Sequence, residues 1–153
     1  MNRRFMLTAI CVLATVATSF QSVRASGGGP KPATLSIRVV DVRNRKGDLI
    51  FGVFQSADGF PTEKGKSVNW QVKPARSGVV FTAELPPGRY SASVLHDENS
   101  NGKMDFGPLG IPLEGYGMTN NPKPKLRKAT FDEARFTLRP KGANLTISIQ
   151  YFN

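Results

Sequence analysis

The stretch VVFTAELPPGRYSASVLHD, residues 79–97, decides the fold class of this chain. Its apolar side chains recur at every second position on both sides of a short break. They are Val79, Phe81, Ala83 and Leu85 before the break, and Tyr90, Ala92 and Val94 after it. A period of two is typical of strands that bury one face, whereas helices repeat about every 3.6 residues. The break, Pro86-Pro87-Gly88, predicts a tight turn because proline presets one backbone angle and glycine tolerates positive φ.

The same period continues on both sides of this stretch. We predict further strands at 35–42, 49–54, 68–72, 131–138 and 145–151. The apolar phase shifts at Val40, which suggests a bulge, and a short helical turn is expected at Asp132 to Ala134. Alternation with Val68 and Val72 assigns Trp70 to the core. With no long amphipathic helix, residues 34–153 are predicted to form one all-β domain, an antiparallel β-sandwich of about seven strands, Ig-like or transthyretin-like.

The N-terminus has the pattern of a secretory signal peptide over residues 1–25. Arg3 and Arg4 precede an apolar run from Phe5 to Phe20, and Val23-Arg24-Ala25 supplies small residues before a cleavage site. The alternative is an uncleaved anchor, but the run is short for a spanning helix. Residues 26–33 are rich in glycine and proline and are predicted to form a linker. The mature protein is therefore expected in the periplasm or outside the cell.

Charge and cysteine content narrow the classes of function. The only cysteine, Cys11, lies in the signal peptide, so the mature chain can form neither disulfides nor thiolate metal ligands. Cleavage removes three arginines and lowers the formal charge from +10 to about +7. In an exported protein this excess favours an anionic lipid surface, glycan or envelope polymer over nucleic acid, although solubility alone also explains it. A basic run supports the same expectation: Lys123, Lys125, Arg127 and Lys128.

A stretch with acidic and amide residues, HDENSNGKMDFGPLGIPLEGYG, begins at His96 and ends at Gly117. Its start matches the calcium-loop pattern D-x-[DN]-x-[DN]-G, with Gly102 at the sixth position. The predicted calcium ligands are the side chains of Asp97, Asn99, Asn101 and Asp105, the carbonyl of Lys103, and Glu114 or water to complete the shell. Calcium prefers six to eight such hard oxygen ligands, which alternate residues of a tight loop can aim inward.

The calcium pattern is incomplete, so a metal-free turn remains an alternative. Pro108 occupies the twelfth position, where an EF-hand has a bidentate glutamate, and no helix flanks the loop. Asp and Asn also hydrogen-bond their own backbone in turns that hold no metal. Repulsion among the clustered carboxylates favours a cation, because Lys103 is the only basic residue close to them in sequence. The second half of the stretch is too apolar for a free loop, and we expect Leu109, Ile111, Leu113, Tyr116 and Met118 to fold onto the sandwich or to form an apolar recognition surface.

His96 is the only histidine and shares the strand face of Tyr90, Ala92 and Val94, which favours a packed structural residue. One alternative is a small hydrolase-like enzyme that uses His96 with Asp97 or Glu114, but no nucleophile motif accompanies them. Another is a carbohydrate or cell-wall binding module, which would expose Trp70 or Tyr116 on a flat face. The residues favour a non-enzymatic protein.

Three segments, LPPGRYSASVLHDENSNGKMD, LGIPLEGYGMTNN and ATFDEARFTL, are similar to an uncharacterised family of exported bacterial proteins, domain of unknown function 2141. The resemblance covers nearly the whole mature chain. It implies a small periplasmic or secreted β-sandwich and implies no reaction. We therefore expect an exported binding or accessory protein of the cell envelope whose acidic loop binds calcium.

Overall fold

The computed structural model describes residues 29–123 and 127–152 of the chain. Within these ranges, eight strands, one short α-helix and two short 3-10 turns follow one another. The strands are β1 (Ala33–Val40), β2 (Asp48–Phe54), β3 (Asn69–Pro74), β4 (Val80–Leu85), β5 (Gly88–Asp97), β6 (Gly115–Met118), β7 (Arg135–Leu138) and β8 (Ala143–Ser148). The helix is α1 (Phe131–Ala134), and the 3-10 turns are η1 (Lys64–Lys66) and η2 (Pro108–Gly110).

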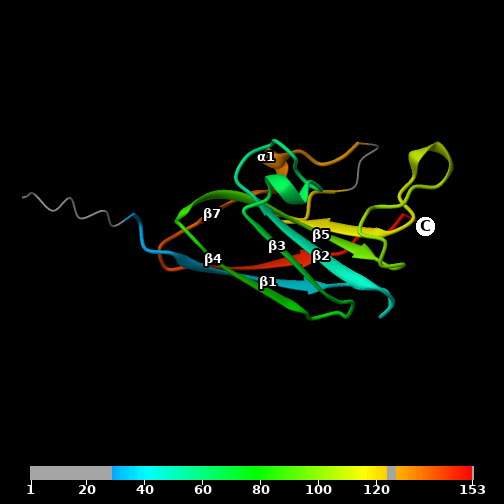
Figure 1. The fold of residues 1–153 in the computed structure, drawn as a ribbon, viewed down its shortest axis with the longest axis horizontal. Coiled ribbons are helices and arrows are strands. Elements are labelled where there is room, and N and C mark those ends of the chain that lie inside the picture. The colour runs from blue at the N-terminus through cyan, green and yellow to red at the C-terminus, as the bar shows by residue number, and fades with distance from the viewer. Residues whose placement is uncertain (1–28, 124–126, 153) are drawn as a thin grey trace, which may run out of the picture.

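The strands form two sheets that pack face to face, as Figure 1 shows. One sheet has the order β4-β1-β8 and the other β3-β2-β5-β6, with β7 paired to the first half of β5. All neighbours are antiparallel except β1 and β8, which run parallel. The predicted all-β sandwich is confirmed. The strands on either side of Pro86-Pro87-Gly88 belong to different sheets, so this turn carries the chain across the sandwich.

The core lies between the sheets and follows the predicted alternation. Leu35, Ile37 and Val39 of β1 are fully buried, and Phe51 of β2 stacks on Phe81 of β4 with ring centroids 4.7 Å apart. The expected bulge at Val40 is wrong, because the register of β1 with β8 is continuous through that residue. The change of phase instead marks the end of the strand, where Asp41 adopts a φ of 60°.

Strand β3 turns its apolar face outward, so the assignment of Trp70 to the core is wrong. Val68 and Val72 are 43% and 53% exposed, and Trp70 is half-buried on the same outer face. The inner face carries Gln71 and Lys73, which donate hydrogen bonds to the carbonyls of Thr82 (2.7 Å) and Val80 (2.7 Å) in β4. Alternation groups the residues of a strand into two faces, but it does not say which face an edge strand turns inward.

Strand β6 is an eighth strand that the periodicity did not predict. Its four residues alternate between glycines on the inner side and the larger Tyr116 and Met118 on the outer side. A Cβ atom at Gly117 would lie 2.5 Å from Cγ2 of Ile147, and one at Gly115 would lie 2.1 Å from the Tyr151 ring. The glycines therefore allow β6 to lie closely against β8 and the C-terminal segment.

Several predictions concern residues outside the described ranges. The signal peptide 1–25, residues 26–28 of the linker and Lys125 of the basic run all lie there. Strand β1 begins at Ala33, the last residue of the predicted linker. None of the helices in the described part of the chain has the length and apolar character needed to cross a membrane.

Candidate functional site

The acidic loop, residues 97–114, begins at the end of β5 and returns to the sheet at the start of β6. In Figure 1 it lies at the right-hand end of the sandwich, beside the C-terminal segment. Asp97, the last residue of β5, is only 1% exposed, and its carboxylate accepts hydrogen bonds from the backbone of Asn101 (3.1 Å) and Gly102 (2.7 Å). Gly102 makes the sharp bend with a φ of 82°. The first and sixth positions of the predicted loop are thus joined directly.

Three further predicted ligands converge on one point. The side-chain amides of Asn99 and Asn101 donate hydrogen bonds to Oδ2 of Asp105 at 2.6 and 2.8 Å. The two amide oxygens accept from the backbone instead, Asn99 from Asn101 (3.1 Å) and Asn101 from Lys103 (3.0 Å). Because a half-turn of each amide would exchange its oxygen and nitrogen, the same backbone can direct three side-chain oxygens toward a common centre.

The donor set fits a hard cation but contains few charges. No group of three or more His, Cys, Asp or Glu side chains within the described ranges is arranged to hold a metal ion. A calcium ion here would therefore depend on Asn and carbonyl oxygens in addition to Asp97 and Asp105. Such neutral oxygens are common calcium ligands, and fewer carboxylates are associated with weaker binding. The hydrogen-bonded loop is also a complete metal-free turn, the alternative that the sequence left open.

Glu114 connects the two ends of the acidic loop. It is 4% exposed, and its carboxylate accepts hydrogen bonds from the backbone of Glu98 (2.9 Å) and Asp105 (3.1 Å). Burial raises the pKa of Glu114, the two backbone bonds oppose this rise, and the charges of Asp97 and Asp105 add to it. Both oxygens thus have partners, while the negative charges of the loop still act on one another.

Glu98 pairs with one cation, Arg43, and with the neutral amide of Asn44, neither of which the sequence pattern indicated. Arg43, from the β1–β2 connection, donates from Nε at 2.7 Å, and Asn44 donates to the other oxygen at 2.9 Å. Burial favours the neutral form, but the hydrogen bonds from Asn44 and Arg43 and the Arg43 charge outweigh it and lower the pKa of Glu98. The prediction that Lys103 is the only nearby cation considered only sequence neighbours, and Arg43 lies 55 residues from Glu98 in the chain.

His96 is fully buried, as its position on the inner face of β5 predicts. Its Nε2 lies 2.9 Å from the carbonyl oxygen of Lys46, and its Nδ1 lies 2.7 Å from the hydroxyl of Tyr151. A carbonyl can only accept, so Nε2 carries the proton and Nδ1 accepts from Tyr151. Both ring nitrogens have internal partners, and neither faces solvent. This geometry argues against His96 as the base of a hydrolase.

The second half of the stretch divides between sheet and solvent. Met118 is buried and Tyr116 half-buried in β6, as expected. Leu109, Ile111 and Leu113 are 98%, 48% and 56% exposed, so the expectation that they pack onto the sandwich is wrong. The loop is closed by its own backbone bond from Gly107 to Ile111 (2.8 Å) and stands clear of the sandwich at the upper right of Figure 1. An apolar surface, the alternative considered for this segment, describes it better.

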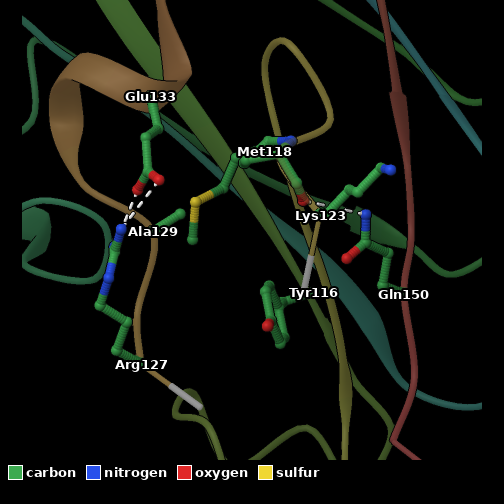
Figure 2. Close-up of a pocket in the computed structure, with 8 residues that line it drawn as sticks. Tyr116, Met118, Lys123, Arg127, Ala129, Glu133 and Gln150 are labelled. Carbon is green, nitrogen blue, oxygen red and sulfur yellow. Dashed lines mark hydrogen bonds and ion pairs between the residues drawn. The ribbon is translucent and has the colours of Figure 1, made fainter. Parts of the chain in front are cut away.

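The described part of the basic run is partly neutralised. Arg127 forms two hydrogen bonds to the carboxylate of Glu133, at 2.8 and 2.9 Å, which Figure 2 shows beside Tyr116 and Met118 of β6. Glu133 also belongs to a capping box with Thr130 at the start of α1. Lys128 is exposed, and no ion pair joins it to another described residue.

The fold and this loop define a small β-sandwich whose most distinctive polar feature is an oxygen-rich loop at one end. The family described as "Uncharacterized protein conserved in bacteria (DUF2141)" matches residues 37–147. The chain belongs to this family. No curated protein and no solved structure matches the chain.

Proposed function

We propose that this protein is an exported, non-enzymatic binding module of the bacterial cell envelope that binds one calcium ion in the acidic loop. The observation that carries the proposal is the convergence of Asn99 and Asn101 on a single oxygen of Asp105, at 2.6 and 2.8 Å. Asp97 lies at the base of the same loop, fixed by two backbone hydrogen bonds. The loop is thus closed before any cation enters. Binding requires both amides to rotate, and the ion must replace the hydrogen bonds that these amides make to Asp105 and to the backbone of Asn101 and Lys103.

The proposed shell contains side-chain oxygens from Asp97, Asn99, Asn101 and Asp105, with the Lys103 carbonyl and water completing six or seven ligands. Glu114 braces the loop from behind through its bonds to the backbone of Glu98 and Asp105. The cation would relieve the repulsion that helps to raise the pKa of Glu114. With only two ionised ligands, we expect a dissociation constant of about 10⁻⁴–10⁻³ M, as in many extracellular calcium modules.

The module would work outside the cytoplasm. The apolar run at Phe5–Phe20 and the small residues before Ser26 support export, and the basic charge of the mature chain supports contact with an anionic envelope polymer, glycan or lipid surface. N-terminal sequencing of the protein from a periplasmic fraction tests export. We expect Ser26 as the first residue, and an intact Met1 in the cytoplasm would contradict it.

Thermal unfolding of the chelator-treated mature protein, with calcium added up to 10 mM, tests the calcium site. If the dissociation constant is near 10⁻⁴ M, saturation stabilises the folded state by about 2.7 kcal/mol. Asp105→Asn should abolish this stabilisation, because asparagine can still accept one amide hydrogen bond but carries no charge. Asp132→Asn, at an exposed carboxylate of α1, is the matched control and should respond like the wild type. No calcium response in the wild type, or an equal response in Asp105→Asn, would contradict the proposal.

A further inference from the structure

The β3-β2-β5-β6 sheet is apolar on its outer face as well as on its core face. Outer-face residues include Ile50 and Met118, which are 7% and 5% exposed, and the half-buried Trp70, Leu95 and Tyr116. A sheet with one solvated face normally shows polar residues on that side. Water would contact this second apolar face unless other parts of the chain or a ligand cover it.

Part of the cover comes from the chain itself. The hydroxyls of Ser91 and Ser93 on β5 donate to the carbonyls of Phe131 (2.6 Å) and Pro61 (2.7 Å), which fix α1 and the η1-containing loop over this face. Phe60 packs edge-on against Phe54 and Phe131 there, with centroids 5.4 and 5.9 Å apart. The cover stops short of the second half of β5.

A groove with a volume of about 820 Å³ lies over the uncovered part. The outer side chains of the sheet form its floor, and Phe106, Leu109 and Ile111 of the η2-containing loop form one wall. Gly52, the cross-strand partner of Trp70, leaves room for the indole on the floor, since a Cβ there would lie 3.0 Å from the indole ring. The volume falls within the range of about 300–1,000 Å³ typical of small-molecule sites.

All the charged residues that line the groove are basic. Its lining includes Lys103, Arg127 and Lys128 and no aspartate or glutamate. Arg127 is paired with Glu133, but neither lysine forms an ion pair with another residue of the described chain. Both lysines line the groove and are exposed, which assigns them to its solvent-facing mouth and not to its apolar floor. An apolar floor beneath a cationic mouth is complementary to a ligand with an apolar chain and an anionic end.

We propose that this groove binds a single long-chain fatty acid as its anion, with the acyl chain along the floor and the carboxylate at the lysines of the mouth. The concave shape and the small-molecule volume favour one extracted chain over insertion into a bilayer or pairing with a second copy. The groove and the proposed calcium shell share no side chain. They have only Lys103 in common, which would offer its carbonyl to the loop and its ammonium to the groove. The two sites can therefore be tested independently.

Trp70, the only tryptophan of the chain, lies on the floor and reports occupancy directly. The mature protein, in chelator-containing buffer, is titrated with saturated fatty acids of 8, 10, 12 and 14 carbons below their micellar concentrations. Changes in Trp70 emission should saturate at one ligand per chain. Affinity should rise about fourfold per added methylene if each becomes fully buried. The primary alcohol of equal length should bind about fivefold more weakly, because it lacks the charge that the exposed lysines attract.

Three variants test whether the ligand binds in the groove and not elsewhere on the protein. Leu95→Gln puts a polar group on the floor and should weaken acid and alcohol alike by about tenfold. The double change Lys103→Gln and Lys128→Gln should leave alcohol binding unchanged and remove most of the preference for the acid. Val72→Thr is the matched control, since Val72 shares the outer face of β3 but does not line the groove, and its affinities should equal those of the wild type.

Four results would overturn the inference. The first is the absence of any emission change or thermal shift with the 14-carbon acid. The second is equal affinity in Leu95→Gln and Val72→Thr when both have native unfolding temperatures. The third is binding to anionic phospholipid vesicles without uptake of monomeric acid, which would make the groove a membrane contact. The fourth is a ligand-free dimer that buries Trp70, detected by sedimentation together with a change in Trp70 emission. Since no calcium is present, none of these results bears on the calcium site.

Discussion

The replacement His96→Phe distinguishes a structural histidine from a catalytic one. His96 joins the end of β5 to Lys46, in the β1–β2 connection, and to Tyr151 through hydrogen bonds of 2.9 and 2.7 Å. Its side chain has no exposed surface. Phenylalanine has a similar shape and makes neither bond. If the role of His96 is structural, the change should lower the free energy of unfolding without depending on any substrate.

The expected size follows from these contacts. Each lost hydrogen bond costs about 1 kcal/mol net, and a partner left buried without a bond costs about 1–3 kcal/mol more. Lys46 is an exposed residue, and the Tyr151 oxygen still accepts from the backbone of Arg43 at 3.1 Å, so we count the two lost bonds with only a small additional penalty for their partners. We therefore expect a loss of about 2–3 kcal/mol, which corresponds to a fall in Tm of about 6–12 °C for a domain of this size.

Urea unfolding followed by Trp70 emission measures the loss, and a double-mutant cycle with Tyr151→Phe isolates the shared bond. The two changes should be less than additive by about 1 kcal/mol, because each removes the same hydrogen bond. Tyr116→Phe is the matched control, since no hydrogen bond joins its hydroxyl to a described residue, and it should change stability little. A loss below about 0.5 kcal/mol in His96→Phe, or strict additivity with Tyr151→Phe, would refute the structural role.

Two further predictions test other contacts. Gly117→Ala should destabilise the domain by about 1–3 kcal/mol, because the new methyl group would lie 2.5 Å from Ile147 and 2.6 Å from the Ser148 carbonyl. The control Gly65→Ala should have little effect, since a methyl group there meets no atom within 4 Å. Equal denaturation midpoints for the two variants would contradict the close packing of β6. The lowered pKa of Glu98 means that its ionised form stabilises the fold above the ordinary value of 4.5 and that this contribution is lost as the pH falls through the folded-state pKa. The stability difference between wild type and Glu98→Gln should therefore be larger at pH 7 than at pH 3 in urea unfolding, and a difference that grows on acidification would have the wrong sign.

The strands could be predicted because alternation is a local property. Residues 79–85 and 90–96 have a clear inner set, and β4 and β5 bury that set. The same rule failed at Trp70, because an edge strand can satisfy a polar inner face through bonds such as Lys73 to Val80. Strand β6 was not predicted because two of its four residues are glycines, which have low strand propensity. Their role, to allow close contact with β8, is visible only in the folded structure.

The candidate site shows the same division between local and distant information. The spacing of Asp97, Asn99, Asn101 and Asp105 predicted a compact loop, and hydrogen bonds within nine residues close it. The pairing of Glu98 with Arg43 could not be predicted, since it depends on how the β1–β2 connection meets the end of β5. The exposure of Leu109 was also unexpected, because composition indicates that a loop is apolar but not what it contacts.

A crystal structure of the mature protein grown with calcium tests the central claim most directly, through the anomalous difference map. Our proposal predicts one peak per chain, with oxygens of Asp97, Asn99, Asn101 and Asp105 and the Lys103 carbonyl at about 2.3–2.6 Å. The Asn99 and Asn101 amides should be rotated so that their oxygens, and not their nitrogens, face Asp105. An acidic loop that keeps both amide hydrogen bonds to Asp105 and shows no peak at 10 mM calcium would contradict the claim.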